Sequence, residues 1–117
     1  MDLMKKQILQ DGGIDVDEAM ARFVQNEALM MKFLLRFSQD KNFDLLKQAM
    51  ENRNAAAGYT AAHTLKGVVG NLSMKDLFTQ ASAVTEDLRR GDLDGAMEKM
   101  PELENQYQRV LRTLESL

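Results

Sequence analysis

His63 is the only histidine in the chain, and it lies in a stretch whose residue pattern predicts a helix. At about 100° per residue, His63, Lys66, Gly67 and Gly70 share one face of that helix. The opposite face carries the apolar residues Ala61, Leu65, Val68, Val69 and Leu72. Because burial of Leu and Val stabilises a fold, the apolar face must turn towards the core, and His63 is expected to be exposed.

An exposed imidazole can act as a nucleophile, because one nitrogen of the neutral ring keeps a lone pair near the unperturbed pKa of about 6.5. Such a ring can carry a transferred group. Lys66, one helical turn further on, would place an ammonium near that group, and cations stabilise the charge that develops on a transferring phosphoryl group. Taken alone, Lys66 would be an ordinary solvated surface charge.

The glycines beside His63 indicate a docking surface. A glycine inside a helix costs about 1 kcal/mol relative to alanine, and here two of them remove side chains where another molecule could approach the ring. Tyr59 and Met74 project within about 40° of His63 around the helix axis. The predicted partner-docking face is therefore Gly67, Gly70, Tyr59 and Met74. Two alternatives remain: Tyr59 could belong to the edge of the core, and Gly70-Asn71 could be a turn that ends the helix early.

Several site types are missing from the sequence. It has no phosphate-binding glycine loop, no glycine signature for a nucleotide, no cysteine and no second histidine for a metal site. We therefore expect a chain without a metal or cofactor of its own, which takes its phosphoryl group from another protein.

The composition predicts a single globular domain over residues 1–117. The chain is 44% hydrophobic and 28% charged, with a net charge of −3 and with Lys and Arg spread along its length. This distribution argues against a nucleic acid or an acidic membrane surface as partner. The N-terminus lacks the apolar segment of an export signal, and no run of about 18 apolar residues could span a bilayer, so the expected location is the cytoplasm.

Amphipathic spacing predicts helices throughout the chain. Gly12-Gly13 ends a short first helix, Asp15 and Asn26 look like caps of the next two, and Asn54 can start the histidine helix, which runs to about residue 72. Short connections between amphipathic helices favour antiparallel neighbours. The expected fold is all-α: an up-and-down antiparallel four-helix bundle, with its core at about residues 26–116 and one or two short extra helices at the N-terminus. Monomer is the default expectation.

The run from Ala62 to Leu72, AHTLKGVVGNL, resembles the signature of histidine-containing phosphotransfer (Hpt) domains of bacterial multistep phosphorelays. The resemblance extends to Gly13–Ala19 upstream and to Leu88–Asp92 downstream, so it covers most of the chain. Two positions depart from the family pattern: Ser73 stands where the family usually has glycine, and Val69 where a smaller residue is common.

The resemblance implies a function. It implies that His63 accepts a phosphoryl group from an aspartate of a receiver domain, or from a hybrid sensor histidine kinase, and passes it to a response-regulator aspartate. Lys66 and Gly67 match the family's basic and small residues, and Mg2+ is expected on the partner receiver domain only. Such a chain would be a carrier rather than an enzyme, with no ATP binding or autokinase activity of its own.

Three other functions are consistent with parts of the sequence. A helical adaptor could bind a receiver or a kinase through the same face without carrying phosphate. The phosphate-accepting domain of a chemotaxis-type kinase shares the His-x-x-Lys-Gly pattern, but that chain should continue into kinase regions. The dimerisation helix of a sensor kinase fits less well, because its histidine is normally followed by an acidic residue, and here Thr64 follows His63.

Overall fold

The computed structural model of residues 1–117 is all-α and contains no β-strand. The helices are α1 (Leu3–Asp11), α2 (Val16–Arg22), α3 (Glu27–Arg36), a 3-10 turn η1 (Phe37–Gln39), α4 (Asn42–Glu51), α5 (Ala55–Asn71), α6 (Lys75–Arg89) and α7 (Leu93–Glu115). No helix combines the length and the apolar character needed to cross a membrane.

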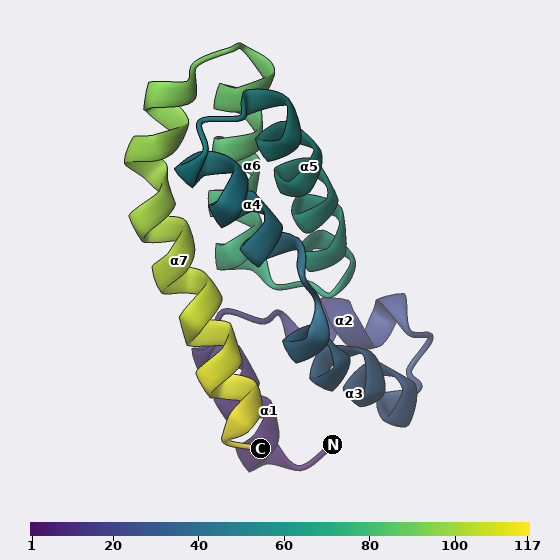
Figure 1. Cartoon of the computed structure of the whole chain (residues 1–117). Coiled ribbons are helices and arrows are strands. Elements are labelled where there is room, and N and C mark those ends of the chain that lie inside the picture. The colour runs from purple at the N-terminus through teal and green to yellow at the C-terminus, as the bar shows by residue number, and fades with distance from the viewer.

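Helices α4 to α7 form the bundle. In Figure 1 they run alternately up and down, and α5 packs against α4 and α6, while α7 packs against α6. The connections between them are turns of a few residues, which bring sequential helices side by side in antiparallel pairs. The sequence prediction of an up-and-down four-helix bundle is confirmed.

The N-terminal region differs from the prediction. Three short helices precede the bundle rather than one or two, because η1 separates α3 from α4. Phe37 is buried at this break, and Asp40 takes an extended conformation with ψ 135°. Helix α3 therefore lies across the lower end of the bundle beside α2 (Figure 1), and the long antiparallel packing begins at Asn42 rather than at about residue 26.

Side-chain caps set most of the helix starts. Asp15, Asn26 and Asn54 each accept a hydrogen bond from the backbone N–H three residues on, as predicted. Such a cap satisfies one of the donors left free at the first turn. Helix α4 has no side-chain cap at Lys41, and Asp40 accepts a hydrogen bond from the N–H of Asn42, the first residue of α4, at 3.1 Å.

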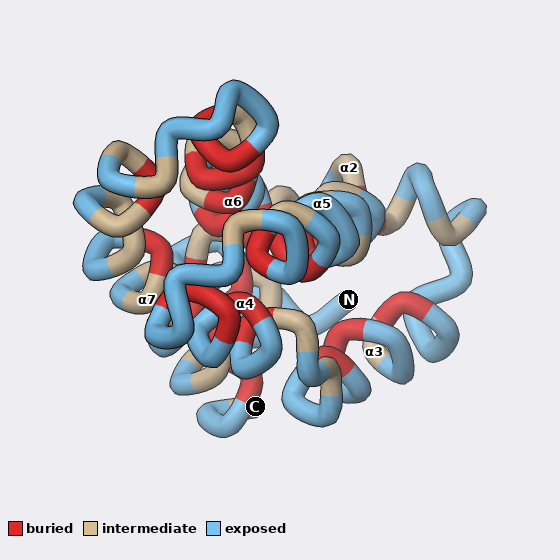
Figure 2. Tube along the Cα trace, turned by 45° about the horizontal axis from the view of Figure 1, so that its top comes forward, coloured by how far each residue is buried: buried red, intermediate tan, exposed pale blue.

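A single core joins the N-terminal helices to the bundle. Buried side chains from α1 and α2, including Leu9 and Val16, belong to the same cluster as Leu65 of α5 and Leu103 of α7. Figure 2 shows the buried residues of α5 on the side that faces the neighbouring helices and the exposed ones on the outside. Helix α5 is thus held along one face and free along the other.

The turn between α5 and α6 is built around Ser73. Its φ is +55°, in the left-handed region where glycine is favoured. Ser73 is fully buried, and its hydroxyl donates to Glu18 Oε1 at 2.9 Å. An isolated antiparallel bridge between Ile14 and Met74 ties the same turn to the α1–α2 connection.

Candidate functional site

His63 lies on the outer face of α5 and is exposed, while Ala62 and Leu65 beside it are buried. Its ring stacks on Tyr59, with ring centroids 5.7 Å apart and planes at 23°. Tyr59 is half-buried, so it belongs both to the edge of the core and to the surface around His63. The expectation that His63 is exposed is confirmed.

Lys66 and Gly67 lie on the side of His63 towards the C-terminal end of α5. Both line a hollow of about 240 Å³ between α2, α5 and the start of α6. Gly67 is exposed, and a Cβ placed on it would meet no atom within 4 Å. Gly67 therefore leaves free space beside the ring, and no contact within the chain requires a glycine at this position.

Gly70 has a different environment. A Cβ on Gly70 would lie 3.1 Å from the ring of Phe78, so α6 packs close to this position. Gly70 also lines the hollow that contains Lys66 and Gly67, and its place on the docking face stays a prediction. Gly70-Asn71 is not a turn that ends the helix early, because α5 continues to Asn71.

Met74 does not border the docking face. The prediction extended the helical spacing of α5 to residue 74, but the helix ends at Asn71 and the chain reverses at Ser73. Met74 then points inwards as the residue before α6, and its exposed fraction is 0%. The prediction for Met74 is therefore wrong, because angular spacing holds only within one helix.

On the α6 side of His63 the surface is charged. Glu86 accepts a hydrogen bond from Nη2 of Arg89 at 2.7 Å, and this contact lowers the pKa of the Glu86 carboxyl, with Lys66 adding a weaker electrostatic effect. The same contact raises the pKa of Arg89. Arg89 also lines a shallow groove of about 360 Å³ together with Tyr59. Sequence analysis did not single out this pair. Its only signal was the spacing of three residues between the two charges.

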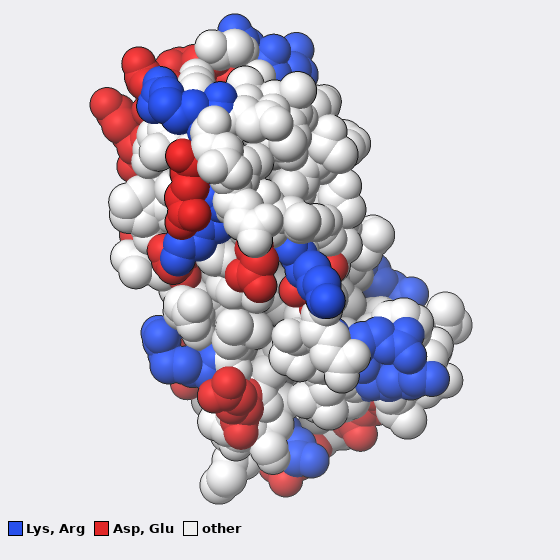
Figure 3. Space-filling view, in the orientation of Figure 1, with Lys and Arg blue, Asp and Glu red and all other residues white.

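On the α4 side the surface is neutral. A groove of about 460 Å³ between α4 and α5 is lined by ten residues, none of them charged. Thr60 and Thr64 form its edge next to His63, and their hydroxyls donate to backbone carbonyl oxygens one turn earlier in α5. Figure 3 agrees, because few charged side chains cover α4 and α5 in that view. His63 therefore has charges on only one of its two flanks.

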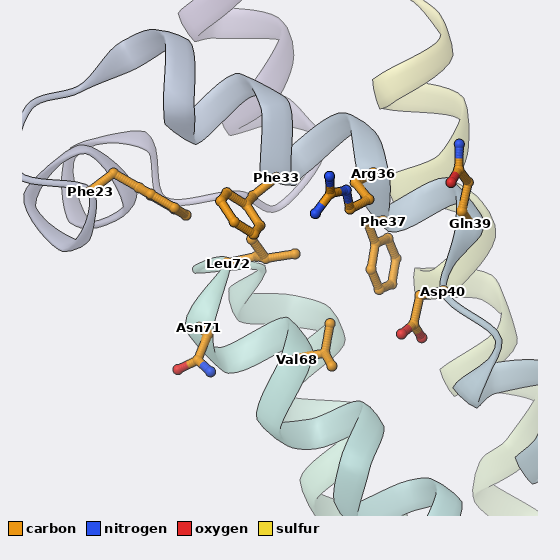
Figure 4. Close-up of a pocket in the computed structure, with 9 residues that line it drawn as sticks. All are labelled: Phe23, Phe33, Arg36, Phe37, Gln39, Asp40, Val68, Asn71 and Leu72. Atoms are coloured by element: carbon orange, nitrogen blue, oxygen red, sulfur yellow. The ribbon is translucent and has the colours of Figure 1, made fainter.

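The largest of these hollows lies between α3 and the end of α5. Its volume is about 550 Å³, and Figure 4 shows Phe33 and Arg36 of α3 above Val68 and Asn71 of α5. Arg36 lies over the ring of Phe33, 5.5 Å from its centroid, and Phe33 stacks on Phe23. An apolar hollow thus lies at the C-terminal end of the histidine helix, on the side of Val68 and Leu72.

Glu18 holds the base of the site together. Besides accepting from Ser73, it forms ion pairs with Lys75 at 2.7 Å and with Arg22 at 3.2 Å. The hydrogen bond from Lys75 is the largest of the causes that lower the pKa of Glu18 to about 2. The backbone N–H of Glu18 donates to the Asp15 cap, and its side chain connects α2 to the α5–α6 turn.

The geometry is that of a helix that presents one imidazole at the surface of a bundle, and comparison with known families agrees. The family model of the Hpt domain matches residues 31–113. The chain belongs to the Hpt domain family. Hpt domains are phosphocarriers of phosphorelay signalling, and they interact there with receiver domains and kinases. No curated protein and no solved structure gives a significant match to this Hpt domain.

Proposed function

We propose that His63 is the phosphoryl-carrying residue of this Hpt domain. It accepts the group from the aspartate of a receiver domain, or from a histidine kinase, and passes it to a response-regulator aspartate. The observation that carries the proposal is the exposure of the only histidine on the outer face of α5, with Lys66 one turn away and free space at Gly67.

The proposed transfer is an in-line displacement. The lone pair of His63 Nε2, the ring nitrogen farther from the backbone, forms a bond to phosphorus. The bond between phosphorus and the aspartyl oxygen breaks, and its electron pair returns to the aspartate as a carboxylate. The ring keeps its proton on Nδ1 during attack and loses it afterwards to solvent. Lys66 offsets the charge on the phosphoryl oxygens during the transfer.

Mg2+ belongs to the partner in this proposal. The receiver domain supplies the ion from its own acidic pocket, where hard oxygen ligands suit it. This chain contributes the nucleophile, the cation at Lys66 and the surface around them. Its proposed working state is a monomer in the cytoplasm.

The test compares the wild type with His63→Gln. Both chains are incubated with a phosphorylated receiver domain and Mg2+, and acid-labile label on this chain is followed over time. We expect the wild type to be labelled and His63→Gln to accept nothing, while its circular dichroism and thermal unfolding stay unchanged, because His63 is exposed. Label on the variant would overturn the assignment.

The rival function is an adaptor that binds a receiver or a kinase through the same face without carrying phosphate. It predicts that no receiver in a broad panel labels the wild type, although binding is intact and survives His63→Gln. The family match favours the carrier.

A further inference from the structure

Glu86 and Arg89 form an exposed ion pair on α6. The Arg89 Nε lies 3.2 and 3.3 Å from the two carboxylate oxygens of Glu86. The Glu86 side chain is 45% exposed and the Arg89 side chain is 60% exposed. Exposed pairs of this kind add little to stability. Arg89 can therefore exchange its partner for a stronger anion at little cost to the fold.

The pair lies level with His63. Helices α5 and α6 are antiparallel, with Phe78 against Gly70 near one end and Arg89 beside Tyr59 towards the other. Glu86 is one turn before Arg89 on α6, so along the antiparallel pair it lies one turn beyond Tyr59, which is the level of His63. The electrostatic effect of Lys66 on Glu86 agrees with this placement.

The neighbouring arginine is already engaged. Arg90 and Lys99 both bind the carboxylate of Asp87, which is 2% exposed and lies at the junction of α6 with α7. Taking Arg90 away would leave a buried carboxylate with one partner fewer. Arg89 is thus the cation of this junction that can turn towards His63.

We propose that Arg89 is a second cation for the phosphoryl group on His63. Glu86 forms an ion pair with Arg89 as long as His63 carries no phosphoryl group. This inference rests on the proposed function. A phosphoryl group brings more negative charge and more acceptor oxygens than a carboxylate, and the planar guanidinium suits it, so Arg89 exchanges one ion pair for another. No covalent bond changes in that exchange. Glu86 is a positioning residue that acts only through Arg89.

The test uses the isolated chain phosphorylated with phosphoramidate. The 31P NMR shift of the phosphohistidine is followed against pH, which gives the midpoint for the last proton of the phosphoryl group. A nearby cation favours the dianion and lowers that midpoint. We expect Arg89→Gln to raise the midpoint, Glu86→Gln to lower it, and Arg89→Lys to stay close to the wild type.

A double variant tests whether Glu86 acts on the phosphoryl group directly or through Arg89. Because Glu86 acts through Arg89, Glu86→Gln combined with Arg89→Gln should behave as Arg89→Gln alone. The equilibrium constant for transfer between His63 and a receiver should change in the same order. Arg89→Gln should shift it about threefold to fivefold away from phosphorylated His63, and Glu86→Gln by a similar factor towards it. These factors are typical of an exposed charge contact.

The ion pair between Lys47 of α4 and Glu104 of α7 is a matched control. Its atoms lie 3.1 Å apart, and Lys47→Gln or Glu104→Gln should leave the midpoint unchanged. Shifts in the same direction for Glu86→Gln and Arg89→Gln would overturn the inference, as would a double variant that keeps the effect of Glu86→Gln. A wild type that takes up no label at His63 would overturn the proposed function instead. A labelled His63 with equal midpoints in every variant would overturn only this inference.

Discussion

At the scale of single residues, the surroundings of His63 differ between its two flanks. The α4 side offers hydroxyls and amides, whereas the α6 side offers the charges of Glu86 and Arg89. Lys66 adds a cation beside Gly67, on the side of His63 towards the C-terminal end of α5. Under the proposed function, an anionic group on His63 would meet charged side chains on the α6 side only, which would leave the α4 side for neutral contacts with a partner.

Gly67 is a position where stability and docking should conflict. Gly67→Ala should raise the free energy of unfolding by about 0.5–1 kcal/mol, because alanine favours helix and its Cβ meets no neighbour. The added methyl group should also slow transfer from a receiver, since it occupies space next to His63. Urea denaturation and initial labelling rates measure the two effects.

Gly70→Ala is the matched control for Gly67→Ala. Its Cβ would lie 3.1 Å from the Phe78 ring, so the ring must shift and the gain in stability should be smaller or absent. A Gly67→Ala chain that transfers at the wild-type rate would mean that partners do not approach over this position.

Sequence reasoning placed residues well where one helix decides the outcome. His63, Lys66, Gly67 and Tyr59 all lie within α5, so their shared face follows from helical spacing. It failed where the outcome depends on another element. The packing of Gly70 involves Phe78 on α6, Met74 lies beyond the end of the helix, and Arg89 of α6 comes next to Tyr59 of α5 only through the packing of two helices.

At the scale of elements, the α5–α6 turn is the point where the N-terminal helices meet the histidine helix. Ser73 is held in a left-handed conformation while its hydroxyl bonds to Glu18 of α2. Three backbone and side-chain links join this turn to residues 13–18: Asp15 N–H to Ser73 O, Lys75 N–H to Gly13 O, and the Lys75–Glu18 ion pair. The position of α2 therefore helps to fix where α5 ends.

The stability of the chain should depend on Glu18 in acid. Its pKa is lowered from 4.5 to about 2, so its contribution is complete above about pH 4.5 and is lost as the pH falls towards 2. Glu18→Gln should be less stable than the wild type near pH 7, and the difference should shrink between pH 4.5 and 2. Urea denaturation followed by circular dichroism across this range measures it.

Glu27→Gln serves as the comparison for Glu18→Gln. The Glu27 side chain is 46% exposed and lies 3.4 Å from the N-terminal amine, so its loss should change the acid dependence much less. A difference between wild type and Glu18→Gln that stays constant from pH 7 to pH 2 would contradict the role of the carboxylate.

At the scale of the whole molecule, the fold class could be predicted from the sequence, but which helices form the bundle could not. Spacing and the Asn54 cap placed α5 within a residue or two, because these signals are local. The break at η1 depends on Phe37 packing into the core next to Tyr107 of α7, a contact between distant parts of the chain. Hence α3 was expected in the bundle but lies across its end.

The N-terminal helices should unfold together with the bundle. Leu9 of α1 is 0% exposed and belongs to the core that also contains Leu103 and Leu114 of α7. Leu9→Ala should therefore lower the free energy of unfolding of the whole chain by about 2–5 kcal/mol through lost burial and a residual cavity, within a single transition.

Leu3→Ala on the same helix removes a side chain that is 81% exposed and should change stability by less than about 0.5 kcal/mol. Thermal and urea unfolding by circular dichroism, with hydrogen exchange to resolve α1, would decide the question. Equal stabilities of the two variants, or loss of α1 in a separate earlier transition, would mean that α1 is not part of the cooperative core.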